Sequence, residues 1–156
     1  MRKVLKLFHS LASCGLIGAL LGYTIVLIHA PQTSPLAYAQ ARQIISLLCN
    51  FLLLPSLAVA LVTGLFSMMV HRPFQDTRWA WFKAVLGLSM FEATLGIIQS
   101  KATTAAVESA KIATGATEPG APADALANEW GALTAIMALS IAQVGLGVWR
   151  PRLARR

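Results

Sequence analysis

Four long apolar runs constrain the fold of this chain more than any other feature of its sequence. A helix that crosses the hydrocarbon core of a bilayer needs about 20 mostly apolar residues. Segments of that length occur at about 5–29, 43–70, 79–98 and 130–149. Only 12% of the 156 residues are charged, about half the share found in soluble domains. We therefore predict an all-α, polytopic membrane protein in which a single domain, residues 1–156, forms an antiparallel bundle of four transmembrane helices.

The distribution of basic residues predicts the orientation of this bundle. With four crossings, ten of the thirteen Lys and Arg residues fall on the side that holds both termini. The opposite side holds Arg42, Lys101 and Lys111. Because cytoplasmic loops carry the Lys and Arg excess, we expect both termini to be cytoplasmic. The net charge of +7 then reflects topology, and we expect no nucleic-acid partner.

The third connection, SKATTAAVESAKIATGATEPGAPADALANE, is much longer than the other two. Its first part is rich in Ala, and Glu108 and Lys111 stand three residues apart, as neighbours on a helix surface do. We predict that the third helix continues out of the membrane over 79–113, until Gly115 and the EPGAP turn end it. The fourth helix is then expected at 123–149. A polar loop is the alternative to this extracytoplasmic helical excursion.

Several polar residues are expected within the membrane. Glu92 lies nine residues beyond Lys83, which places it about 13 Å deeper and near the midplane. A carboxyl group there must be neutral or paired, so we expect Glu92 to face the interior of the bundle. Gln99, seven residues further on, is expected on the same helix face. Asn50 and Gln143 are further candidates for buried polar groups.

Small residues recur every four positions along the first helix, at Ser10, Cys14, Gly18 and Gly22. Such a stripe lets helix backbones approach closely in lipid. We expect it to pack within the bundle, and the alternative is contact with a second copy or with a larger membrane complex. In the second helix, Pro55 is expected to cause a kink because it lacks a backbone N–H.

Three stretches of the chain resemble a known group of proteins: LKLFHSLA, LPSLAVALVTGLFSMM and WAWFKAVLGL. They are similar to small bacterial inner-membrane proteins related to copper-resistance protein D, a group that includes the HemJ-type protoporphyrinogen oxidases. The resemblance covers about residues 1–100. It implies haem or porphyrin binding by a histidine of the first helix and a lysine of the third, which here are His9 and Lys83.

Three classes of function stay open. In the first, the protein binds haem b or a porphyrin in a redox or cofactor-handling role, with His9 and His71 as candidate axial ligands and Lys83 or Arg78 pairing with a propionate. The second is a small proton- or metal-linked carrier that uses Glu92. The third is a non-enzymatic accessory or structural subunit. The sequence holds no HExxH, paired-cysteine or GxSxG motif, so it predicts no metal-ligand set and no catalytic residue.

Overall fold

The structure, a computed structural model, describes residues 2–70, 78–116 and 123–149. These ranges are almost entirely helical and contain no strand. Four of the helices in this part of the chain are long and apolar enough to cross a membrane, which confirms the all-α, four-span prediction. In chain order the elements, with η marking a π-helical stretch, are α1 (Arg2–His29), α2 (Pro35–Leu48), η1 (Cys49–Leu53), α3 (Leu54–Val70), α5 (Arg78–Ala93), η2 (Thr94–Gln99), α6 (Ser100–Ala113) and α7 (Ala123–Trp149).

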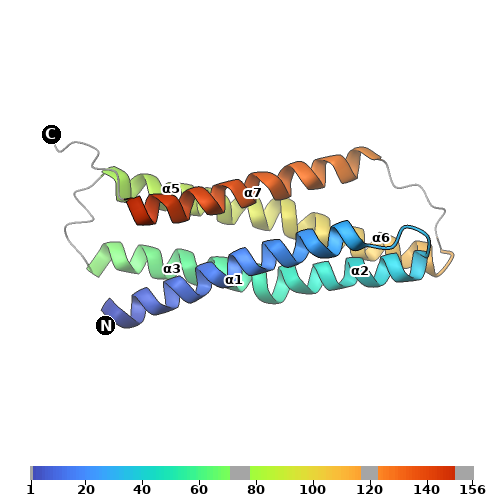
Figure 1. The fold of residues 1–156 in the computed structure, drawn as a ribbon, viewed down its shortest axis with the longest axis horizontal. Helices are drawn as coiled ribbons and strands as arrows, with labels where there is room; N and C mark the ends of the chain where they lie inside the picture. The colour runs from blue at the N-terminus through green and yellow to red at the C-terminus, as the bar shows by residue number, and fades with distance from the viewer. Residues whose placement is uncertain (1, 71–77, 117–122, 150–156) are drawn as a thin grey trace.

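The second and third crossings are each one continuous helix of 36 residues, Pro35–Val70 and Arg78–Ala113. At 1.5 Å per residue each is about 54 Å long, whereas the hydrocarbon core is about 30 Å thick. Figure 1 shows the consequence, because α2 and α6 extend beyond α1 and α7 at the end of the bundle where α7 begins. The two overhanging segments pack along each other. The helical extension predicted after residue 98 is therefore present.

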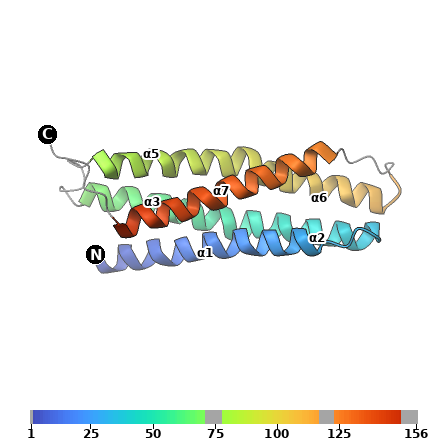
Figure 2. The same ribbon diagram turned by 45° about the horizontal axis from the view of Figure 1, so that its top comes forward.

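The four crossings close into an antiparallel bundle (Figure 2). Helix α1 contacts α3, α3 contacts α5, α5 contacts α7, and α7 contacts α1. The start of α1 and the end of α3 lie at the same end of the bundle as the start of α5 and the end of α7. We call this the first end, and the opposite one the second end.

Local chemistry sets the start of the second helix at Pro35, eight residues before the expected start. The hydroxyl of Ser34 accepts a hydrogen bond from the backbone N–H of Ala37 at 3.4 Å. Proline favours the first helical position because its fixed φ suits the helix and its missing N–H would have no partner there. Most of the segment expected as an outer loop is consequently helical.

Gly115 ends the overhanging part of the third helix, as the sequence predicts. Its φ of +73° lies in the left-handed region, which glycine adopts without a steric penalty. The Gly115 N–H donates to the carbonyl of Ile112, and the Ala116 N–H donates to that of Lys111. These two bonds form a Schellman motif, which satisfies carbonyls left open by the helix end.

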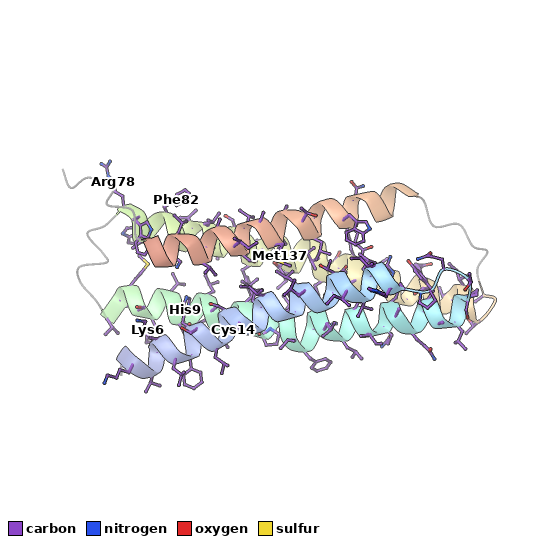
Figure 3. The ribbon with its side chains drawn as sticks, viewed as in Figure 1. Lys6, His9, Cys14, Arg78, Phe82 and Met137 are labelled. Carbon is purple, nitrogen blue, oxygen red and sulfur yellow. The ribbon has the colours of Figure 1, made fainter. Side chains whose placement is uncertain are left out.

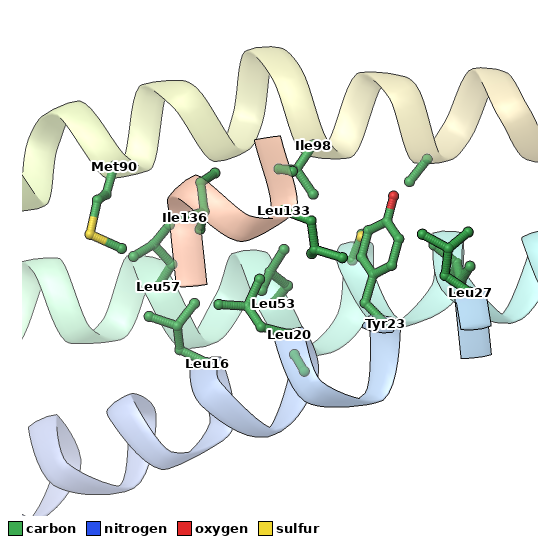
Figure 4. Close-up of a cluster of buried hydrophobic side chains, with 14 residues drawn as sticks. Leu16, Leu20, Tyr23, Leu27, Leu53, Leu57, Met90, Ile98, Leu133 and Ile136 are labelled. Carbon is green, nitrogen blue, oxygen red and sulfur yellow. The ribbon is translucent and has the colours of Figure 1, made fainter. Parts of the chain in front are cut away.

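Mostly leucine and isoleucine side chains fill the interior of the bundle, while other large apolar side chains point outward. Figure 4 shows part of the core, with these side chains labelled: Leu16, Leu20, Tyr23, Leu27, Leu53, Leu57, Met90, Ile98, Leu133 and Ile136. Outward-facing residues are equally apolar, for example Phe51, which is 77% exposed, and Leu11, which is 66% exposed. A surface this apolar suits contact with lipid rather than water.

A π-helical stretch, η1, occurs where the sequence predicts a kink. The N–H of Leu54 donates to the carbonyl of Cys49, five residues earlier. Pro55 follows directly, and its ring would crowd the carbonyl four residues before it in a regular α-helix. A wider turn gives that carbonyl room. The second π-helical stretch, η2, lies beside η1 in the neighbouring crossing.

Candidate functional site

His9 lies at the first end, between α1 and α3, and is half-buried. Its Nδ1 is 2.9 Å from the carbonyl oxygen of Ala60 and 3.1 Å from the hydroxyl of Thr63. A carbonyl oxygen only accepts hydrogen bonds, so Nδ1 carries the proton and Nε2 keeps its lone pair. The ring packs against Gly64, where a Cβ would lie 3.5 Å from Cε1.

Lys83 faces into the same end of the bundle from α5 and is half-buried. Its ammonium lies within electrostatic range of His9 and 5.8 Å from the ring centre of Trp79. A Cβ on Gly147 of α7 would come within 2.9 Å of Nζ, so this glycine makes room for the ammonium. Gln143, also on α7, donates from Nε2 to the backbone carbonyl of Lys83 at 3.2 Å. Lys83 therefore packs between helices.

Of the other two residues predicted to hold a cofactor, Arg78 is not brought to His9, and His71 cannot be compared. Arg78 is exposed at the start of α5, and Figure 3 shows it at the same end as His9 but pointing away from the bundle. His71 lies outside the described residues. Among the residues that the structure places, no three His, Cys, Asp or Glu side chains gather into a metal site.

An amide pair lies near the middle of the bundle, where the two π-helical stretches meet. Gln99 of η2 donates from Nε2 to Oδ1 of Asn50 in η1 at 3.0 Å. Asn50 in turn donates from Nδ2 to the carbonyl of Ser46 at 2.9 Å. The two residues, predicted as buried polar groups, are half-buried and are joined by this hydrogen bond. Neutral pairing suits this depth, because charges are costly there.

Glu92 does not face the interior, and the expectation that it does is wrong. The residue is exposed on the outer surface of α5, and no hydrogen bond or ion pair engages it among the described residues. The inward face of this crossing is marked by Met90 and Thr94, which are 2% and 0% exposed. At about 100° per residue, Glu92 points about 200° away from either of them.

The π-helical stretch η2 explains why Glu92 and Gln99 do not share a face. Seven residues of regular α-helix make almost two full turns, which would align their side chains. A π-helical turn takes up one extra residue, so the helix after it is rotated by about 100°. Gln99 therefore points inward to Asn50, while Glu92 points to lipid.

The small-residue stripe of the first helix also faces outward, and the expectation that it packs within the bundle is wrong for three of its members. Ser10, Cys14 and Gly18 are exposed, and only Gly22 is half-buried. Nothing lies within 4 Å of a Cβ placed on Gly18. The close approach is made by Gly15, where a Cβ would lie 2.5 Å from Oγ of Ser56 on α3.

A buried ion pair towards the second end is the most tightly connected polar feature of the structure. Arg42 of α2 donates from Nη1 to Oε1 of Glu129 on α7 at 2.6 Å, with side chains only 3% and 5% exposed. The hydroxyl of Tyr23 on α1 donates to the same oxygen at 2.5 Å. Arg42 also donates from Nε to the hydroxyl of Tyr38 at 2.9 Å. We call these four residues the Arg42–Glu129 network, and it connects three helices.

Sequence reasoning missed this network. Arg42 and Glu129 each stand beside the first residue of an expected apolar run, at 43 and at 130, so both were assigned to connections. The second helix instead begins at Pro35, and the fourth begins at residue 123 as predicted, so both side chains lie within helices that span the membrane. A signal was available, because both residues fall on the same predicted side and have opposite charges. The pairing of Arg42 with Glu129 could not be predicted, because it depends on tertiary packing between segments 87 residues apart.

Comparisons with known proteins place the chain in a family. No curated protein matches the chain, and no solved structure does. The resemblance to the copper-resistance-D and HemJ-type group stays a prediction, since the family description mentions neither. A family model described as "Predicted integral membrane protein (DUF2269)" matches residues 3–151, and the chain therefore belongs to this family of predicted integral membrane proteins.

Proposed function

We propose that the protein binds haem b or a porphyrin at the first end of the bundle, with His9 as axial ligand. The observation that supports this is the hydrogen bond from Nδ1 of His9 to the carbonyl of Ala60. Metal-bound histidines usually donate their second ring N–H in this way, which fixes the tautomer and orients the ring. Nε2 is then the ring nitrogen that would ligate the haem iron. When bound, haem supplies one-electron redox chemistry.

Lys83 is suited to hold a propionate in this proposal. It is a cation within electrostatic range of His9, and Gly147 allows its ammonium to lie between α5 and α7 at this end of the bundle. Arg78, at the start of α5, points away from the bundle (Figure 3), so Lys83 rather than Arg78 is the proposed partner of a propionate. His71 is the candidate for a second axial ligand.

An absorption spectrum of protein purified after haem-supplemented expression tests the proposal. We expect a Soret band that His9→Ala abolishes while the helical content is retained. The matched control is His29→Ala, because His29 is exposed near the second end of the bundle and, among the described residues, is hydrogen-bonded only within its own helix. Lys83→Met should weaken haem binding but keep the position of the band. A colourless wild-type protein, or equal loss with His29→Ala, would overturn the proposal.

An accessory role in a larger membrane complex is the second candidate, favoured by the outward-facing Ser10, Cys14 and Gly18 on α1. Small residues on a lipid-facing surface allow another helix to pack closely. Gly18→Leu should then dissociate a co-purifying partner without unfolding the bundle, since nothing lies within 4 Å of that position.

The proposed location is a bacterial inner membrane, with both termini in the cytoplasm. The excess of Lys and Arg at the first end supports this orientation. A reporter that is active only in the periplasm, fused after Arg156, should stay silent. Strong activity of that reporter would reverse the orientation.

A further inference from the structure

The position of Glu92 on the outer surface of α5 leaves a carboxyl group facing lipid. It stands nine residues from Lys83 on one side and nine from Lys101 on the other, about 13 Å from each along the axis. Its side chain is too short to reach a headgroup from that depth, unlike the long stem of a lysine. Placing an ionisable side chain in hydrocarbon costs several kcal/mol of free energy unless a partner group bonds to it. The described residues of this chain supply no such partner for Glu92.

The surface around Glu92 is shaped for a close-packed helix. Ser89 precedes it by three residues and Gly96 follows it by four, and both are exposed as Glu92 is. Nothing lies within 4 Å of a Cβ placed on Gly96, so no helix of the bundle requires a glycine there. Small residues on either side of a polar one allow two helices to approach until their polar side chains bond.

We propose that this face of α5, formed by Ser89, Glu92 and Gly96, docks a second copy of the chain. In a twofold dimer each residue near the axis meets its own equivalent. A protonated carboxyl group is self-complementary, because it offers one O–H donor and one carbonyl acceptor. Two Glu92 carboxyl groups therefore hydrogen-bond to each other across the axis. Neither lipid tails nor any described side chain of the same copy offers Glu92 such a hydrogen bond.

The chain contains a matched comparison between two outward-facing glycines. Gly96 lies on the proposed interface and Gly18 on the small-residue stripe of α1, and neither has a neighbour within 4 Å of an added Cβ. Leucine is therefore tolerated within the monomer at both positions. Only one of the two substitutions obstructs a dimer formed through α5.

The test is energy transfer between labelled copies reconstituted in phosphatidylethanolamine–phosphatidylglycerol vesicles over a range of protein-to-lipid ratios. Wild type should self-associate. Glu92→Leu should raise the dissociation constant about eightfold, the effect of losing the two interhelical hydrogen bonds of the carboxyl pair. Glu92→Gln should stay close to wild type, because a carboxamide also donates and accepts. Gly96→Leu should weaken association, and Gly18→Leu should not.

Disulfide cross-linking in membranes gives an independent readout. In a Cys14→Ser background, Ser89→Cys should form a covalent dimer on mild oxidation, whereas Gly18→Cys should not. Self-association unaffected by Glu92→Leu and Gly96→Leu, or cross-linking through Gly18→Cys alone, would overturn the proposal. A wild-type protein that stays monomeric at every ratio would overturn it as well.

Discussion

Replacing Arg42 by methionine should destabilise the protein more than any other single change we consider. The carboxylate of Glu129 would lose its only charged partner among the described residues and keep only the hydrogen bond from Tyr23, 2.5 Å long. The side chain of Glu129 is 5% exposed, so water cannot replace the guanidinium. Removing one member of a buried ion pair costs about 3–5 kcal/mol, because an uncompensated charge is left behind. We expect Arg42→Met to lower the free energy of unfolding by this amount.

Matched variants separate the cost of a stranded charge from loss of packing. The double variant Arg42→Met/Glu129→Leu removes both charges and should recover most of the stability, as apolar replacements of buried pairs often do. Lys111→Met breaks the exposed pair with Glu108, whose side chains are 50% and 49% exposed, and should cost less than about 1 kcal/mol. Tyr23→Phe should cost about 1.5–3 kcal/mol, the range for a hydrogen bond to a charged group.

Unfolding by sodium dodecyl sulfate in mixed micelles, followed by helical circular dichroism and by tryptophan fluorescence, measures these differences. Trp130 is adjacent to Glu129 in the chain and reports on this end of α7. The reasoning fails if Arg42→Met stays within about 1 kcal/mol of wild type, below the range for a broken buried pair. It also fails if the double variant is less stable than Arg42→Met alone.

Two further predictions concern packing in the middle of the bundle. Asn50→Leu and Gln99→Leu should each lower the free energy of unfolding by about 1 kcal/mol. A double-mutant cycle should show positive coupling between the two positions, since interhelical hydrogen bonds in membranes average about 0.6 kcal/mol. Additive effects of the two substitutions would contradict the hydrogen bond between them. Gly15→Ala should lower the free energy of unfolding by about 1–3 kcal/mol through overpacking against Ser56, and adding Ser56→Ala should restore most of that loss. Gly18→Ala should leave the free energy of unfolding unchanged in the same assay. Equal effects at the two glycines would contradict the packing described for α1.

The four crossings were predictable because they depend on length and composition alone. A run of about 20 apolar residues needs no knowledge of its neighbours to be assigned to the membrane. The start of the second helix was not predicted, because Pro and Ser near residue 34 are equally typical of loops and of helix N-termini. In the structure these residues form a helix N-terminus, in which the Ser34 hydroxyl accepts a hydrogen bond from the N–H of Ala37.

The facing of side chains was harder to predict than the spans. Glu92 and Gln99 were placed on one face by α-helical spacing, and η2 breaks that spacing between them. Asn50 and Gln99 nevertheless face each other between the helices, where they are half-buried and hydrogen-bonded. A π-helical stretch has no sequence signature comparable to a proline or a capping residue, so this rotation was not available from the sequence.

The charge of the polar groups in the bundle varies with their depth in the membrane. The ion pair of Arg42 and Glu129 lies towards the second end, His9 and Lys83 lie at the first, and the middle holds the neutral pair of Asn50 and Gln99. This order follows the cost of burying charge, which rises towards the centre of the membrane.

Glu92 is the exception to this order, since it is ionisable, central and turned to lipid. Folding alone does not account for its position, because leucine there would match the surrounding apolar surface at no cost in desolvation. A carboxyl group on that surface is consistent with the depth order only when it is kept neutral and hydrogen-bonded by a partner. The contrast between Glu92→Gln and Glu92→Leu therefore separates the two accounts: equal self-association of these variants would mean that the carboxyl group has no partner, whereas a selective loss with leucine would mean that a second protein surface satisfies it.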